Sequence, residues 1–417
     1  MVPALPAGAG GFRRRGCGGE RTGPPTDTET DRGRSWSVEV EQQRHRDGEG
    51  ELQRADCRLQ NVQGGMMRIL YAVTVAGSAY NLLRGQLGWL RVRGHDVHLA
   101  CAPGPELAAV AAREGVPVHP LPLVREPSWG RDLPALLAAV RLVRRLRPDV
   151  VFAATTKAGL VLMTAARLCR VRRRIRAVWG LRHETLHGRR RSVVRLAERA
   201  SCRFANTVVA ISPSIAARLQ AESIAPSDRI VTPGPGTCNG VDARRFARIP
   251  ERAAAGRALR RELGVPAGGL VIGFVGRLVR DKGIAELLSA FRRLRPRFDG
   301  LRLLLVGGFE TGDALAASVR AELARDPGII LAGRVADPVR FYHAMDVLCL
   351  PSRREGFPNV PLEAAAAELP VVTTDATGAC DSVAAGVTGL VVPVGDVAAL
   401  TEALARLAAF PGLRRQM

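Results

Sequence analysis

Two glutamates in the last quarter of the chain have the type and spacing to bind one polar ligand at two points. Glu355 and Glu363 lie eight positions apart in the segment REGFPNVPLEAAA. A turn from Glu355 to Pro358 leads into an apolar helix predicted over about 359–367, so Glu355 precedes the helix and Glu363 lies about one turn inside it. A helix amino terminus suits oxygen-rich ligands because its N–H groups are unpaired. The pair is therefore suited to hydroxyl groups such as those of a sugar and a ribose; the alternative is a surface helix with ordinary amino-terminal acids.

Two cations follow an apolar strand earlier in the chain. The segment LVIGFVG ends at Gly276, and Arg277 and Lys282 follow it in the turn RLVRDKG. Only two of the 61 basic residues are lysines, Lys157 and Lys282, which favours a position where a compact ammonium is needed. Two cations beside glycines at a strand-to-helix turn predict a diphosphate site, although neither a Walker loop nor a dinucleotide fingerprint is present. The alternative is two surface cations in a turn.

The strands that precede these residues are expected to bring them together. Pro351 ends the apolar segment DVLCL, which leaves Glu355 just beyond the carboxyl end of a strand. Arg277 and Lys282 follow the carboxyl end of another strand. The sequence therefore predicts that Arg277, Lys282, Glu355 and Glu363 converge at one edge of a sheet.

Small residues open the first predicted helix. The first strand runs into TVAGS, where Gly77 and Ser78 begin the helix. Small residues at this position let a helix terminus approach the same ligand. A plain tight turn is the alternative.

The order of apolar segments predicts an α/β fold. Short apolar strands alternate with helix-length segments from Met67 to the carboxyl terminus. A Pro- and Gly-rich passage at 231–242 interrupts the alternation, which predicts two Rossmann-like, doubly wound domains, 66–236 and 237–417, that face each other across a cleft. Residues 1–65 are rich in Gly, Pro, Arg and acids without a period, which predicts a disordered extension and is consistent with a mis-assigned start.

The net charge of +22 is distributed unevenly. Residues 1–65 contain ten arginines and ten acids, whereas 167–203 contain thirteen arginines and two glutamates. Such a patch attracts nucleic acid or an anionic membrane surface. No aromatic residues alternate with the arginines, so a nucleic-acid partner is not expected. The segment RRRSVVRLAERASCRF mixes apolar and basic residues as an interfacial helix does; a solvated basic face is the alternative.

Hydropathy and cysteine spacing indicate where in the cell the protein is expected. No apolar run in the sequence reaches the length of a membrane span, and no signal-peptide pattern opens it. The eight cysteines have neither CxxC nor metal-ligand spacing, which is typical of a reduced, cytoplasmic protein. No metal site is predicted.

Several segments together resemble glycosyltransferase family 4, whose members have the GT-B fold: VGRLVRDKG, SRREGFPNVPLEAAA, CNGVD and AAGVTGLVVPVGD. The segments TVAGSAYNLLRGQ, TTKAGLV and WGLRHET resemble members that build lipid-linked oligosaccharide, capsular or exopolysaccharide repeat units. The resemblance implies a retaining, metal-independent hexosyl- or N-acetylhexosaminyltransferase, peripheral at the inner face of the cell membrane. Its donor would be a nucleotide-diphosphate sugar, with UDP preferred and GDP second, and its acceptor a lipid-linked or polysaccharide glycan.

The resemblance also assigns roles to individual residues. The domain 66–236 would bind the acceptor and 237–417 the donor. Glu355 would contact the donor sugar, and His183 would lie near it as a catalytic candidate, with a structural, hydrogen-bonding role as the alternative. The resemblance assigns donor binding to Arg277 and Lys282 (diphosphate), Glu363 (ribose), Gly356 and Phe357. The strand-to-helix turns add Gly276, Gly77 and Ser78 to the expected donor-binding residues. No cofactor is implied.

Two other classes of function stay open. The chain ends in PGLRRQM, where family members usually continue with a helix that crosses back onto the first domain, so a truncated carboxyl terminus is expected. This favours, as one alternative, a weak or inactive relic that binds a sugar nucleotide. The other alternative is a basic nucleic-acid-binding protein that uses residues 167–203.

Overall fold

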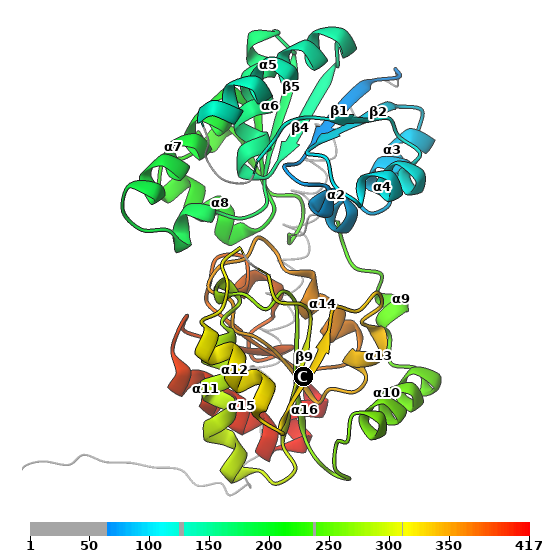
Figure 1. The fold of residues 1–417 in the computed structure, drawn as a ribbon, viewed down its shortest axis with the longest axis vertical. Coiled ribbons are helices and arrows are strands. Elements are labelled where there is room, and N and C mark those ends of the chain that lie inside the picture. The colour runs from blue at the N-terminus through cyan, green and yellow to red at the C-terminus, as the bar shows by residue number, and fades with distance from the viewer. Residues whose placement is uncertain (1–64, 125–128, 237–238, 311) are drawn as a thin grey trace, which may run out of the picture. The chain divides into compact units, whose positions relative to one another are not determined.

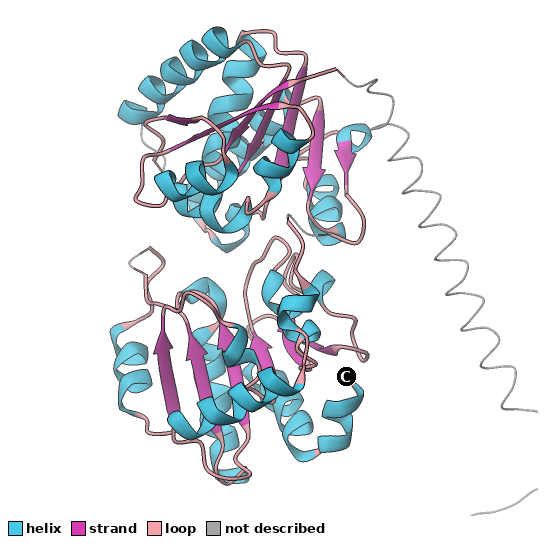
Figure 2. Ribbon diagram, turned by 90° about the vertical axis from the view of Figure 1, so that its right-hand side faces the viewer, coloured by secondary structure: helices cyan, strands magenta, loops and turns pink. Residues whose placement is uncertain are grey.

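The structure is a computed structural model, and it describes residues 65–124, 129–236, 239–310 and 312–417 (Figure 1). The predicted extension, 1–65, lies outside the described residues except for Gly65. The described chain forms two sheets whose strands are all parallel, each covered by helices on both faces (Figure 2).

The first sheet has seven strands in the order β3-β2-β1-β4-β5-β6-β7. Their bounds are β1 Arg68–Ala72, β2 Asp96–Cys101, β3 Val118–Pro120, β4 Val150–Ala154, β5 Arg173–Val178, β6 Thr207–Ala210 and β7 Ile230–Val231. Alternate residues of one strand enter different cores, because successive side chains of a strand point to opposite faces. Leu70 of β1 packs on one face, whereas Ile69 and Tyr71 pack on the other.

Seven helices accompany this sheet, and the two cores divide them between its faces. The helices are α2 Ala76–Leu82, α3 Gln86–Val92, α4 Leu107–Glu114, α5 Trp129–Leu146, α6 Thr156–Leu168, α7 Gly188–Phe204 and α8 Pro213–Ala221. Helices α2, α3 and α4 cover one face, and α5, α6, α7 and α8 cover the other. Helix α6 packs against both α5 and α7.

The second sheet has six strands in the order β10-β9-β8-β11-β12-β13. Their bounds are β8 Val271–Val275, β9 Arg302–Val306, β10 Ile329–Gly333, β11 Val347–Leu350, β12 Val371–Thr374 and β13 Gly389–Val392. Its helices are α9 Ala243–Phe246, α10 Pro250–Glu262, α11 Ile284–Leu294, α12 Ala317–Arg325, α13 Val339–Tyr342, α14 Asn359–Ala366, α15 Val397–Ala409 and α16 Pro411–Gln416. Helices α11, α12 and α15 line one face, and α10, α13 and α14 line the other.

Every strand predicted from the sequence is present, and the prediction of two Rossmann-like sheets is confirmed. The predicted boundary between 236 and 237 falls between β7 and β8, and residues 237 and 238 lie outside the described part. Helix α8 was not predicted, although its signal was present: Ser212 caps it by accepting a hydrogen bond from the Ile215 N–H, and Pro213 opens it.

Two further predictions concern the environment of the chain. Within the described residues, no helix is both long and apolar enough to cross a bilayer. Five cysteines lie in the described part and all are free thiols: Cys101, Cys169, Cys202, Cys349 and Cys380. The other three cysteines lie outside it.

Candidate active site

The strand order of the second sheet reverses between β8 and β11. Strands β9 and β10 lie on one side of this pair, and β12 and β13 lie on the other. The chain therefore leaves β8 and β11 in opposite directions, which opens a crevice beyond their carboxyl ends where doubly wound sheets bind ligands. Arg277 and Lys282 follow β8, and Ser352 and Glu355 follow β11, so four polar side chains border this point.

A glycine allows the two loops to touch. Gly283 has a φ of +69°, in the left-handed region that glycine adopts without strain. A Cβ at this residue would lie 2.0 Å from the carbonyl oxygen of Pro351, so any other residue would push the loops apart. The approach places Lys282, the preceding residue, beside the loop that contains Glu355.

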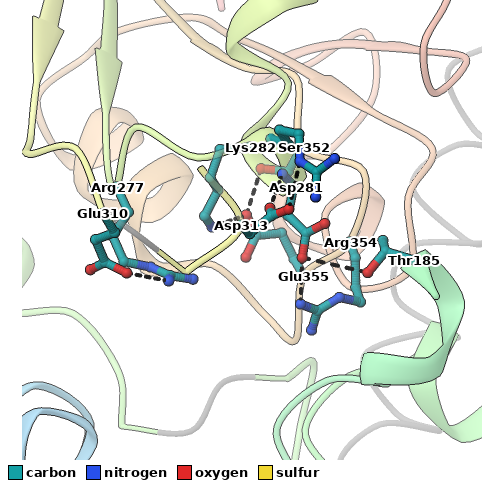
Figure 3. A network of polar contacts seen from close by, with 10 residues as sticks. Thr185, Arg277, Asp281, Lys282, Glu310, Asp313, Ser352, Arg354 and Glu355 are labelled. Carbon is teal, nitrogen blue, oxygen red and sulfur yellow. Dashed lines mark hydrogen bonds and ion pairs between the residues drawn. The ribbon is translucent and has the colours of Figure 1, made fainter. Parts of the chain in front are cut away.

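Lys282 and Glu355 form an ion pair in this crevice (Figure 3). Ser352, which is fully buried, donates a hydrogen bond of 2.6 Å to the same oxygen, Glu355 Oε1. Within the described residues, Glu355 Oε2 accepts no hydrogen bond. The carboxylate is therefore fixed through one oxygen and keeps the other available for a hydroxyl group.

Arg277 is held by a different carboxylate. Its Nη1 lies 2.9 Å from Oε2 of Glu310, in the loop after β9. Oε1 of Glu310 lies 3.9 Å from Nη2 of Arg334, in the loop after β10. Lys282, Ser352 and Glu355 are here called the Lys282 cluster. Figure 3 shows Arg277 and Glu310 as a pair separate from this cluster.

Asp281 connects the loops around Lys282. Its carboxylate accepts a 2.7 Å hydrogen bond from Arg354 and a 3.5 Å hydrogen bond from Thr185 (Figure 3). Its N–H donates to Asp313 at 2.7 Å, and Asp313 also pairs with Arg280. Arg353 pairs with Glu286 in the same way. Each of the five cations in the loops after β8 and β11 therefore has a carboxylate partner, which fixes its position.

Glu363 lies apart from this network, on α14. It is half-buried, and the hydroxyl of the fully buried Tyr342 donates a 2.5 Å hydrogen bond to its Oε2. Burial raises the pKa of the Glu363 carboxyl above its ordinary value, and the Tyr342 hydrogen bond only partly offsets that rise. The partner of this carboxylate therefore comes from α13.

The backbone around Glu355 suits a polar ligand. Within the described residues, the N–H groups of Gly356 and Phe357 have no acceptor, and Pro358 has no N–H. A Cβ on Gly356 would lie 2.4 Å from the carbonyl oxygen of Trp179, so glycine allows the close approach of the loop after β5. The ring of Phe357 is buried in the apolar core that includes Leu181.

The remaining predicted residues lie in other surroundings. Gly276 has a φ of +149°, and its carbonyl oxygen would lie 1.7 Å from a Cβ on Gly307, so this strand end is tightly packed. Gly77 and Ser78 lie in the first turn of α2, as predicted, and a Cβ on Gly77 would approach Glu106 to 3.7 Å.

His183 is fully buried, which leaves its predicted catalytic role without direct support. It lies in a short 3-10 helix, Arg182–Thr185, and its Nε2 is 3.0 Å from Oε2 of Glu222. Its Nδ1 is buried without a hydrogen-bond partner. The structure thus gives His183 the hydrogen bond expected of a structural role, while contact with a donor sugar stays a prediction.

Sequence reasoning missed several charged residues of the site: Asp281, Glu310, Asp313, Arg334 and Arg354. Asp281 and Arg354 are sequence neighbours of Lys282 and Glu355, so their position in the motifs could have identified them as residues of the site. Glu310 follows the apolar segment LRLLLVGG by two residues, so a charged residue just beyond a strand end was the available signal. Within the described part, no three His, Cys, Asp or Glu side chains form a group suited to a metal ion.

A separate cavity of about 1020 Å³ lies at the opposite edge of the second sheet, near the amino ends of β8 and β11. Its lining includes Arg260, which pairs with Asp346, and Arg414, which donates to carbonyl groups at the end of α15. These arginines have structural partners. The cavity is not lined by the residues that follow the carboxyl ends of β8 and β11.

Comparisons with known proteins agree with this architecture. Residues 269–409 match the family model described as glycosyl transferases group 1, and residues 79–245 match Glycosyltransferase Family 4. The capsular polysaccharide biosynthesis glycosyltransferase CapM of Staphylococcus aureus is 34% identical over 344 residues, which are 82% of this chain and 87% of CapM.

Solved structures have the same fold. Anabaena HepE in complex with UDP and glucose aligns with a TM-score of 0.69 at 22% identity, over 84% of this chain and 92% of HepE. The sucrose-phosphate synthase of Thermosynechococcus elongatus aligns with a TM-score of 0.67 at 21% identity, over 84% and 92%.

The two parallel sheets and the charged switch point define a glycosyltransferase of the GT-B type. The chain belongs to glycosyltransferase family 4. The predictions of family and fold class are thereby confirmed.

Proposed function

We propose that this glycosyltransferase moves a hexosyl or N-acetylhexosaminyl unit from a UDP-sugar to a lipid-linked or polysaccharide acceptor, with retention of configuration and without a metal ion. The single observation that carries the proposal is that Arg277, Lys282 and Glu355 follow the carboxyl ends of β8 and β11, where the strand order of the second sheet reverses. Arg277 and Lys282 bind the diphosphate, Glu355 contacts the sugar, and Glu363 binds the ribose.

The chemistry follows from the charges. When the sugar leaves, negative charge develops on the diphosphate, and two preorganised cations stabilise it. Lys282 is held by Glu355, so its ammonium is oriented before the donor arrives. In the proposed retaining reaction, the acceptor hydroxyl attacks from the side that the diphosphate leaves, and a phosphate oxygen takes the hydroxyl proton. This route needs no pair of carboxylates of the kind that retaining glycosidases use.

The donor and acceptor are inferred from relatives. HepE was solved with UDP and glucose, which supports UDP over GDP. CapM is a capsular polysaccharide biosynthesis enzyme and matches 82% of this chain, which supports a repeat-unit or lipid-linked acceptor.

The proposal is tested by titrating the full chain with UDP, GDP and ADP in a calorimeter, with Glu363→Ala and Arg277→Ala as variants. UDP is expected to bind selectively, and both variants are expected to weaken it. No binding of any nucleotide by folded protein would contradict the donor assignment, and selective GDP binding would correct the base.

A second test addresses transfer. With a UDP-sugar and a lipid-linked acceptor, the product's anomeric proton coupling, measured by NMR, is expected to match the configuration of the donor. Donor binding without transfer to any lipid-linked acceptor would identify a binding relic instead.

The outer surface of the first sheet's helices supports contact with an anionic membrane. On α7, Val193 and Leu196 are 52% and 66% exposed, and they lie among the exposed Arg189, Arg190 and Arg191. Helix α5, which packs with α7 on α6, also exposes leucines and arginines: Leu133, Leu137, Arg141, Arg144 and Arg145. Exposed apolar groups flanked by arginines are typical of interfacial helices.

Co-sedimentation with liposomes tests this contact. More protein is expected to sediment with vesicles that contain anionic lipid than with neutral vesicles. Equal sedimentation would contradict membrane contact, and salt-sensitive binding to RNA by the same arginines would indicate a nucleic-acid partner.

A further inference from the structure

Glu310 lies between two arginines at three neighbouring strand ends. Strands β8, β9 and β10 are adjacent in the second sheet, and Arg277, Glu310 and Arg334 follow them. Oε2 of Glu310 is 2.9 Å from Arg277, whereas Oε1 is 3.9 Å from Arg334. One carboxylate therefore has a close partner and a second cation within reach.

This arrangement conflicts with an anion bound at Arg277. A diphosphate that approaches Arg277 meets a guanidinium whose charge Glu310 already neutralises, and two anions on one guanidinium repel each other. The Lys282 cluster offers no excess charge either, because Lys282 pairs with Glu355. The charges of these side chains thus nearly cancel, and a carboxylate must move before Arg277 can bind the diphosphate fully.

Arg334 is suited to receive that carboxylate. Its side chain is 76% exposed, so it can follow Glu310 without disturbing a packed core. Glu310 is only half-buried, and transfer to Arg334 keeps its charge compensated. Within the described residues, Arg334 has no other carboxylate partner.

We propose that Glu310 is a positioning residue that holds Arg277 in the empty site and passes to Arg334 when the donor diphosphate binds. The inference rests on the proposed role of Arg277 in diphosphate binding. It adds Glu310 and Arg334, which do not touch the donor, to the residues that set donor affinity. The pair orients Arg277 before the donor arrives, and breaking it costs part of the free energy of donor binding.

A double-mutant cycle of UDP affinity tests this exchange in the full chain. Glu310→Gln is expected to tighten UDP binding by about two- to fivefold, because a competing, partly exposed ion pair is removed. Arg334→Gln is expected to weaken binding by about the same factor, since Glu310 then stays on Arg277. In the Glu310→Gln background, Arg334→Gln is expected to have no effect.

A matched control separates this exchange from a general loss of positive charge. Arg292 is exposed and lies 3.2 Å from Glu322, on helices outside the strand switch. Arg292→Gln is expected to leave UDP affinity unchanged. If it weakens binding as much as Arg334→Gln does, the effect is one of net charge and the exchange is overturned.

Other results of the double-mutant cycle would each overturn the inference in a recognisable way. Equal weakening by Arg334→Gln in both backgrounds would show direct contact of Arg334 with the nucleotide and overturn the inference. Weaker binding by Glu310→Gln would overturn it as well, through direct contact of Glu310 or lost support for Arg277. If wild-type protein binds no UDP, or Arg277→Ala binds it normally, the proposed diphosphate site fails, and this inference fails with it.

Discussion

The carboxyl edge of the second sheet and the outer face of α7 are both rich in arginine, yet they use charge in opposite ways. At the sheet edge, Arg277, Lys282 and Arg354 each pair with a carboxylate and are partly buried. On the outer face of α7, Arg189 and Arg191 are exposed and, within the described residues, have no carboxylate partner. Paired cations have defined positions, whereas unpaired cations supply an attractive field.

Helix α7 shows both uses on its two faces. Its inner face places Glu198 against Arg176 of β5 at 2.8 Å, and both side chains are fully buried. Thr156 and Ser201 complete this network with hydrogen bonds to Glu198 and from Arg176. The difference between the faces shows that burial, rather than residue type, decides whether an arginine is structural or free to meet a partner.

The largest effect is expected where the buried pair is broken. Glu198→Ala leaves the Arg176 guanidinium buried without a counter-charge, so the free energy of unfolding is expected to fall by about 3–5 kcal/mol. Urea denaturation measures this change. Arg189→Gln, on the outer face of the same helix, is the control and is expected to stay within about 0.5 kcal/mol of wild type. Similar losses in the two variants would remove the distinction between the faces.

The next effect concerns catalysis. In the proposed reaction, Lys282 stabilises the charge that develops on the diphosphate. For Lys282→Ala, kcat/KM for sugar transfer is therefore expected to fall by about 100- to 1000-fold. Initial rates of UDP release measure this. Lys282→Arg keeps the charge in a different geometry and is expected to recover only part of the rate. A loss below about tenfold in Lys282→Ala would mean that the paired cation orients the loop and does not stabilise the leaving group.

A smaller effect, on membrane binding, is expected from the exposed arginines on the outer face of α7. Changing Arg189, Arg190 and Arg191 together to Gln is expected to weaken binding to anionic liposomes by about 1 kcal/mol for each arginine that lies near the surface. UDP affinity is expected to stay unchanged in the same protein, which also shows that it folds. Unaltered liposome binding would assign these arginines to solvent alone.

The smallest effect concerns Glu363. Because burial raises its carboxyl pKa, the folded state binds more protons than the unfolded state between the ordinary pKa of 4.5 and the raised one. Stability from this group is therefore present at lower pH and is lost as pH rises through that window. Glu363→Gln is expected to remove this loss and to raise the unfolding temperature at pH 7, relative to wild type, by about 2 °C. An identical pH dependence of the unfolding temperature in the two proteins would contradict the raised pKa.

The local sequence predicted most of the fold, because the patterns that mark strands and helix ends each span only a few residues. Apolar runs such as LRLLLV predict β9, and an Asp396 cap precedes α15, where the side chain accepts from the Ala399 N–H. Helix α3 was not predicted, and Gly85, at φ +76°, begins it as a second helix after α2. This break depends on backbone conformation and not on the apolar pattern.

For the site, the sequence located the residues but not their partners. Arg277, Lys282, Glu355 and Glu363 were singled out, whereas Glu310 and Tyr342 were not, because each partner lies on another strand end or helix. Glu310 is 33 residues from Arg277, and Tyr342 is 21 residues from Glu363. Parallel strands joined by helical crossovers create such long-range pairs.

The sequence by itself determined the strands, the two α/β halves and the motif residues at the strand ends, because apolar periodicity and glycine spacing are local properties. Only the tertiary structure decided which charges are neutralised. It placed Lys282 against Glu355, Arg277 against Glu310, and His183 in the interior beside Glu222. Strand order and burial set these pairings, and both depend on how segments distant in sequence pack together.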